Sequence, residues 1–414
     1  MSLKKSHLKF IISIIIVFFT VYNITFTKLA SLPTARIAFF VVIILEFPAI
    51  LLFLKNHFRN STSKLYYTAL LFVFIYSATQ YIASPVDNTQ FSRVLFFILF
   101  SFVSAIGLAS LLNFKIDRVA KVIAIAIFIQ SLFIFIDYNS ADFHSFVSNQ
   151  LVQSERYRED WIRAVGLTNG GGSSLSLVQF SGFVVSLYVI NKSSNIVTTY
   201  VFSLMAISIF FSTLLTGRTG VVLEIIFIIL YPLTQKITTL RVIKTYIIVL
   251  ISIGIVFFIF NNYILEMMLN SNSKFEFLLL WLEEILELDK GGTVNTLQSM
   301  TIPPLSMETI FGTGLVSNPD GSNASGSDIG YIQTYYALGL IFSIIFYSSL
   351  LLYSTVSFKK YFKSDYKFWI LFTLLIFVAE FKEPYIFKYS LTFVLFSILS
   401  CRYYIIANNQ LFER

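Results

Sequence analysis

The chain has 414 residues, of which 56% are hydrophobic and only 13% charged, whereas a soluble domain carries roughly 25% charged residues. This composition excludes a water-soluble protein, and the net charge of +8 does not indicate nucleic acid because the basic residues form no cluster on a soluble face. One cysteine excludes an internal disulfide, and three separated histidines show no metal-ligand spacing, so we expect neither a protein-bound metal nor a cofactor.

Apolar runs follow one another along the chain, each near the ~20 residues that cross a ~30 Å hydrocarbon core. In lipid each backbone group must be satisfied within its own segment, so these runs predict helices. The sequence therefore predicts an all-α polytopic membrane protein with about twelve spans, at residues 8–24, 36–54, 65–83, 91–112, 119–138, 173–191, 196–215, 219–234, 243–263, 329–353, 367–381 and 385–406. The first run resembles a signal peptide, but no cleavage motif follows it, and we expect it to be retained.

The basic residues predict the orientation of these spans. Lys and Arg accumulate in short cytoplasmic segments. With the N-terminus inside and an even number of spans, most of the 30 Lys and Arg residues fall on the inner side. We therefore expect both termini to be cytoplasmic.

Two long outer segments interrupt what is otherwise expected to be a single membrane domain over residues 1–414. They cover residues 139–172 and 265–328, and long outer loops of this kind usually carry function. Residues 274–288 place apolar and acidic side chains on different faces, which predicts an amphipathic helix on the membrane surface. Its acidic residues are typical of a solvated face.

The first candidate site closes the first long loop. Arg156, Arg158 and Arg163 precede Asn169 and a run of glycines that enters a span. Backbone N–H groups at a Gly-rich helix start, together with guanidinium groups, form a natural site for an anion. The alternative is a loop that is anchored to lipid headgroups.

The second candidate is Arg218, in a short outer turn of sequence Thr-Gly-Arg-Thr-Gly between two apolar spans. Arg keeps its charge and can bind phosphate oxygens with two parallel hydrogen bonds, and Glu224 could orient it. The alternative is an arginine that only extends to the membrane interface.

The late loop and the last outer turn hold the remaining candidates. Gly312 and Gly314 precede Asp328, which lies directly before a span, although a Ser-Asp pair there is also a common helix N-cap. Lys382 lies among acidic residues in the turn before the last span, and these charges can pair with one another or with the arginines.

Taken in order, these features resemble the polymerases of Wzy-dependent polysaccharide synthesis and the related O-antigen ligases. Members of this group have many spans, a basic outer loop that ends in an Arg…Gly…Asn turn, a Ser/Thr-x-Arg turn between spans, and a large late loop that closes with Gly-x-Gly and a polar residue. The matching residues are Arg163, Gly166, Asn169, Arg218, Gly220, Gly312, Gly314, Asp328, Gly330 and Gly339. The ligases carry a His in the late loop, and residues 265–328 contain none, which favours a polymerase.

The resemblance implies a GT-C-like glycosyltransferase of the bacterial cytoplasmic (inner) membrane. Its substrates would be oligosaccharide repeats on undecaprenyl diphosphate, joined at the outer face into O-antigen or another surface polysaccharide. Arg218 would neutralise the leaving diphosphate without a metal, and Asp328 is the nearest substitute for a base. The groups that would bind the substrate and its diphosphate are Arg156, Arg158, Arg163, Asn169 and Lys382. A chain-length regulator and a flippase would be partners.

Two other classes of protein stay open besides a ligase. A flippase or other transporter would also have about twelve spans, but its ionisable residues are expected at the membrane midplane, between repeated halves. A receptor or assembly subunit would not need arginines near the bilayer.

Overall fold

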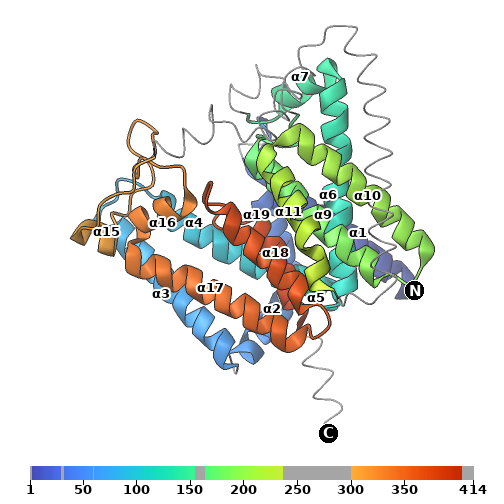
Figure 1. The fold of residues 1–414 in the computed structure, drawn as a ribbon, viewed down its shortest axis with the longest axis horizontal. Coiled ribbons are helices and arrows are strands. Elements are labelled where there is room, and N and C mark those ends of the chain that lie inside the picture. The colour runs from blue at the N-terminus through green and yellow to red at the C-terminus, as the bar shows by residue number, and fades with distance from the viewer. Residues whose placement is uncertain (1, 29–31, 59, 154–163, 236–299, 403–414) are drawn as a thin grey trace. The chain divides into compact units, whose positions relative to one another are not determined.

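The computed structural model describes residues 2–28, 32–58, 60–153, 164–235 and 300–402, and every regular element in these ranges is a helix (Figure 1). Within these ranges, seven helical stretches are long and apolar enough to cross a membrane. They are Thr34–His57, Ser61–Ala83, Thr89–Leu111, Ile116–Asn139, Ser173–Lys192, Ile196–Thr216 and Leu340–Tyr361. Three shorter apolar helices cover Ser6–Tyr22, Tyr366–Ala379 and Ser390–Ser400. The chain is thus a helical membrane protein. The expected span 243–263 and the expected amphipathic helix 274–288 lie outside the described residues.

The described residues fall into two compact units. The first unit lies within residues 1–126, 225–235 and 301–414, and the second within 127–224 and 236–300. The first unit contains α1 (Ser2–Tyr22), α2 (Thr34–His57), α3 (Ser61–Ala83), α4 (Thr89–Phe96), the π-helix η1 (Phe97–Val103), α5 (Ser104–Leu111), α15 (Met307–Phe311), α16 (Gly330–Leu338), α17 (Leu340–Tyr361), α18 (Tyr366–Ala379) and α19 (Ser390–Ser400). The second contains α7 (Ala141–Gln150), α9 (Ser173–Lys192) and α10 (Ile196–Thr216). Two helices, α6 (Ile116–Asn139) and α11 (Arg218–Thr234), have residues in both units.

Helices α3 and α17 of the first unit lie antiparallel. At one end, the Asn60 amide donates a hydrogen bond of 2.8 Å to the Tyr361 hydroxyl. At the other, the rings of Tyr76 and Phe342 stack with centroids 3.7 Å apart. Because α17 begins beside the end of α3, residues near the C-terminus of α3 and the N-terminus of α17 share one end of this unit.

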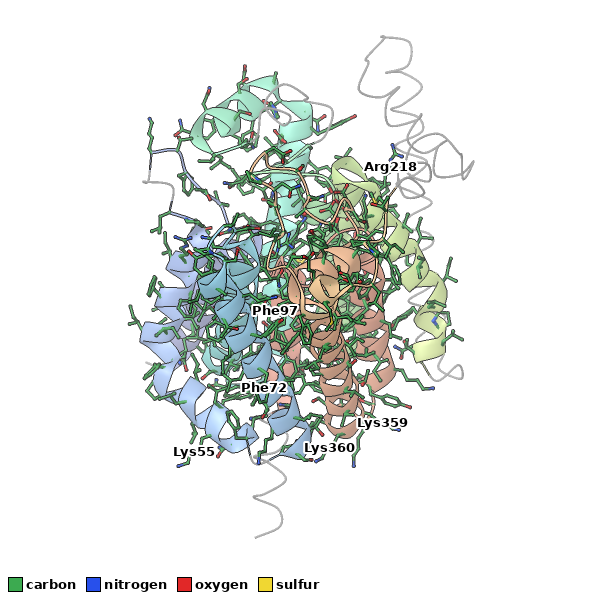
Figure 2. All side chains as sticks on the ribbon, turned by 90° about the vertical axis from the view of Figure 1, so that its left-hand side faces the viewer. Lys55, Phe72, Phe97, Arg218, Lys359 and Lys360 are labelled. Atoms are coloured by element: carbon green, nitrogen blue, oxygen red, sulfur yellow. The ribbon has the colours of Figure 1, made fainter. Side chains whose placement is uncertain are left out.

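Lys55, Lys359 and Lys360 lie at the other end of this unit, which we call the lysine end (Figure 2). The buried guanidinium of Arg402 lies near it, where it donates hydrogen bonds to the hydroxyls of Ser63, Ser357 and Tyr353. Lys and Arg accumulate in cytoplasmic segments, so the sequence predicts that the lysine end is cytoplasmic.

Reporter fusions test that orientation. We expect fusions at Ser357 and Thr239 to report the cytoplasm, and fusions at Asn149 and Asn295 to report the outside, because short cytoplasmic segments retain Lys and Arg. Alkaline phosphatase and green fluorescent protein fusions would provide the two opposite signals. Reversed signals at two of the four sites would contradict the predicted orientation.

The second unit is held together by polar contacts between tightly packed helices. The Ser131 hydroxyl of α6 and the Ser212 hydroxyl of α10 donate to the Gln179 side-chain oxygen of α9, over 3.0 and 3.2 Å. A Cβ at Gly182 would overlap Ile127, so α9 and α6 are in contact there. Small residues and interhelical hydrogen bonds are the usual means by which membrane helices associate, and here they fix the start of α9.

Candidate functional site

The turn that carries Arg218 packs against the start of α9. A Cβ on Gly217 would lie 2.7 Å from the carbonyl oxygen of Gly172, and one on Gly220 would overlap the carbonyl of Ser176. The Gly220 N–H also donates to the Ser176 hydroxyl over 3.1 Å. Both glycines are therefore required by close backbone approach, which a side chain would prevent.

This packing places two helix N-termini side by side. Helix α9 begins at Ser173 after Gly172, which provides no side-chain cap, and α11 begins at Arg218 itself. Helix N-termini carry partial positive charge. The half-buried Arg218, at the tip of the α10–α11 hairpin (Figure 2), adds a full positive charge. These groups can together bind an anion.

Glu224 of α11 lies deeper in the second unit and is fully buried. Its Oε1 accepts a hydrogen bond of 2.8 Å from the Thr213 hydroxyl of α10. The carboxyl group therefore joins the two helices of the hairpin and stabilises the turn that presents Arg218.

The segment between Arg163 and α9 is anchored by Asp137, a residue to which sequence reasoning gave no role. The buried Asp137 carboxylate accepts the Val165 and Gly166 N–H groups, over 2.6 and 3.0 Å, and His144 Nδ1 lies 2.9 Å away. Gly166 has φ of +56°, in the left-handed region that favours glycine. The sequence signal that could have identified Asp137 is its position as an acidic residue in the last turn of an apolar span.

Asn169 is half-buried in this anchored segment, three residues before Gly172. Arg156, Arg158 and Arg163 lie outside the described residues. Of the expected diphosphate-binding groups, Arg218 and Asn169 therefore belong to the second unit, on two segments that meet where Gly172 contacts Gly217.

The Gly-x-Gly motif of the late loop forms a packing junction in the first unit. Gly312 has φ of +84°, and a Cβ there would overlap the backbone of Gly339, between α16 and α17. The Gln80 amide of α3 donates to the carbonyls of Gly312 and Ala337, over 3.1 and 3.2 Å. The motif thus joins α15, α16 and α3 at the end opposite the lysine end.

Asp328 is exposed at this end, where its carboxylate accepts a hydrogen bond from the Asn323 amide. Helix α16 begins two residues later, with Ile329 as an N-cap that makes no side-chain hydrogen bond. The Ser327 hydroxyl accepts the Ile329 N–H over 3.2 Å. Asp328 therefore does not serve as the N-cap, and its carboxylate faces solvent, as a base would require.

The start of α16 packs onto the turn that follows α18. The Gly330 N–H donates to the Glu380 carbonyl over 3.0 Å, and a Cβ on Gly330 would lie 2.6 Å from the Glu383 carbonyl oxygen. Lys382 is exposed in this turn, and Glu383 forms an ion pair with Lys388. The structure thus brings the helix that follows Asp328 against the turn that carries Lys382.

Glu380 is fully buried beneath this turn. The Tyr347 hydroxyl lies 2.6 Å from its Oε1, and the Ile386 N–H donates to its Oε2 over 2.8 Å. The charges of Arg93 and Lys388 also act on this carboxyl group.

Sequence reasoning missed Arg93, which lies in the second turn of α4. Its Nη2 donates to Gln333 Oε1 of α16 over 3.2 Å, and the charges of Glu380 and Asp87 act on it. A basic residue just inside an apolar span was the signal that could have found it.

Within the described ranges, no group of three or more His, Cys, Asp or Glu side chains lies close enough together to hold a metal ion.

Comparisons with known proteins returned no relative: no protein-family model matches this chain, nor does any curated protein or solved structure. Function must therefore be argued from the residues and their geometry.

Proposed function

We propose that this protein is a polymerase that joins undecaprenyl-diphosphate-linked oligosaccharide repeats into O-antigen or another surface polysaccharide. In this proposal it crosses a bacterial cytoplasmic membrane about twelve times, with a GT-C-like fold and both termini inside. It acts at the outer face, where the lipid-linked repeats are presented. A flippase and a chain-length regulator would be partners.

One observation carries the proposal: the Arg218 turn is packed onto the Gly-rich start of α9. Two helix starts and Arg218 therefore lie close together beside apolar helices, and in this proposal a lipid diphosphate headgroup binds there. Arginine stays charged and binds phosphate oxygens with fixed geometry. A diphosphate leaving group needs its developing negative charge neutralised, and preorganised donors do this efficiently.

The reaction follows from these groups. A hydroxyl oxygen of the acceptor sugar attacks the anomeric carbon of the donor chain, and the bond from that carbon to the diphosphate oxygen breaks. The electron pair leaves with the diphosphate, whose charge Arg218 neutralises with Asn169 and the arginines of the preceding loop. The hydroxyl proton passes to a base, for which the sequence resemblance implies Asp328, and the same resemblance implies that Lys382 contributes to substrate binding.

Deletion of the gene in its host tests the assignment. The strain should lose long polysaccharide but still display single repeats, because export and ligation continue without chain growth. Gel electrophoresis of the surface polysaccharide, with a complemented strain as the control, measures this. Complete loss of surface sugar, with lipid-linked repeats trapped inside, would indicate a flippase instead.

Reconstitution provides the direct measurement. Purified protein in vesicles, supplied with lipid-linked repeats extracted from the deletion strain, should lengthen them and release undecaprenyl diphosphate. Repeats that stay single under these conditions would overturn the proposed activity.

A further inference from the structure

One face of α4 carries buried polar atoms that have no hydrogen-bond partner among the described residues. Gln90 is only 2% exposed, yet neither its Nε2 nor its Oε1 is bonded, and the Nη1 of Arg93 is likewise buried and unbonded. Residues three apart lie on the same face of a helix. Buried polar groups nearly always have partners, so three unsatisfied atoms on adjacent turns need an explanation.

The same face is connected to the segment that carries Asp328. Arg93 Nη2 donates to Gln333 Oε1, and the Gln333 amide donates to the carbonyls of Ser327 and Asp328, over 3.2 and 3.3 Å. The guanidinium is therefore held in place through Gln333, while its Nη1 is buried and makes no hydrogen bond within the described residues.

The backbone of this helix is unusual directly after Arg93. Helix α4 continues into the π-helix η1, over Phe97–Val103, before α5 resumes the α-helical pattern. Stretches of π-helix are rare and are found frequently at functional sites. Here the π-helix is fastened by the Ser101 hydroxyl, which donates to the Tyr389 carbonyl over 3.1 Å.

The charges around Arg93 determine which ligand would fit. Glu380 opposes the positive charge, and it is bonded to Tyr347 and the Ile386 N–H. Asp87 also acts on Arg93, but its carboxylate is occupied by the N–H groups of Val316 and Ser317 and by Thr89. With no excess positive charge, an anion is not favoured. The buried atoms that lack a partner among the described residues are two donors, Gln90 Nε2 and Arg93 Nη1, and one acceptor, Gln90 Oε1. This set matches sugar hydroxyls, because a hydroxyl both donates and accepts hydrogen bonds.

We infer that Gln90 and Arg93 form a binding site for an uncharged, hydroxyl-rich sugar, which is the acceptor unit of the polymerisation. The inference rests on the proposed function and adds a site that selects the acceptor sugar. Gln333 connects this site to Asp328, because it accepts a hydrogen bond from Arg93 and donates one to the Asp328 carbonyl. Bound sugar hydroxyls complete the hydrogen bonds of Gln90 and Arg93, which also places an acceptor hydroxyl near the Asp328 segment.

The substitution Gln90→Leu separates a ligand site from a merely unsatisfied amide. Leucine removes both amide atoms at similar volume, so the variant should melt at the same or a higher temperature. If the amide binds the acceptor, the KM for the acceptor repeat should rise about 10-fold, with a smaller change in kcat. Arg93→Lys keeps the positive charge beside Glu380 but loses the planar guanidinium with its several N–H donors. It should therefore raise the KM by a similar factor.

The probe is the free oligosaccharide repeat released by mild acid from the extracted lipid, which lacks the diphosphate. Full-length protein should bind it in calorimetry, and Gln90→Leu should bind it about 10-fold more weakly. The matched control is Thr20→Val, because the Thr20 hydroxyl of α1 is also buried without a partner among the described residues. Thr20→Val should leave both KM and binding unchanged.

Unchanged KM and unchanged binding in Gln90→Leu would overturn the inference, while a wild-type protein that still forms polymer would leave the proposed function standing. Conversely, Gln90-dependent binding of the free repeat by a protein that makes no polymer would retain the sugar site and overturn the polymerase assignment.

Discussion

Arg218→Ala should abolish long polymer in a protein that still inserts and expresses normally. Arg218 is the first residue of α11, at the tip of a hairpin, and it is half-buried, so its truncation leaves no large cavity. What it removes is a charge-assisted contact to the leaving diphosphate, and loss of one such donor lowers turnover by roughly 10²-fold or more. Chain length on gels and the rate in vesicles measure the effect.

Two further variants separate catalysis from simple loss of charge. Arg218→Lys should restore only part of the activity, because an ammonium keeps the charge but loses the two-pronged geometry. Arg118→Ala is the matched control, since Arg118 is also half-buried in the first turn of an apolar helix. Normal chain lengths in Arg218→Ala would show that the arginine only extends to the interface, and would move the phosphate site to Arg156, Arg158 and Arg163.

Gly312→Ala should destabilise the first unit more than the same substitution at any other glycine in the described part of the late loop. An alanine at φ of +84° costs about 1 kcal/mol in backbone strain, and its Cβ would also overlap the backbone of Gly339. Backbone cannot move aside as a flexible side chain can, so we expect a total loss of about 3 kcal/mol or more, or failure to fold.

Gly321→Ala is the matched control for this variant. Gly321 has φ of +83°, almost the same as Gly312, but no atom lies within 4 Å of the position its Cβ would take. The two variants therefore carry the same backbone strain and differ only in the steric overlap. Scanning fluorimetry in detergent should give a much larger fall in melting temperature for Gly312→Ala, and equal falls would contradict the packing argument.

The sequence by itself determined that this is a helical membrane protein. Apolar runs that must satisfy their own hydrogen bonds can only be helices, so the expected spans 36–54 and 65–83 correspond to Thr34–His57 and Ser61–Ala83. Both helices extend a few residues beyond the expected spans, whereas the expected span 329–353 is broken at Gly339 into α16 and α17. The Arg218 turn was also visible, since its chemistry is contained in five consecutive residues.

Only the tertiary structure decided which distant residues meet. Gln80 and Gly312 are far apart in sequence, as are Arg93 and Gln333, so no local pattern links them. Asp137 looked isolated until folding brought the Val165 and Gly166 N–H groups to its carboxylate. The physical reason is common to all these cases: hydrogen-bond partners and close backbone approaches depend on how the helices pack, whereas composition and periodicity report only that each helix forms.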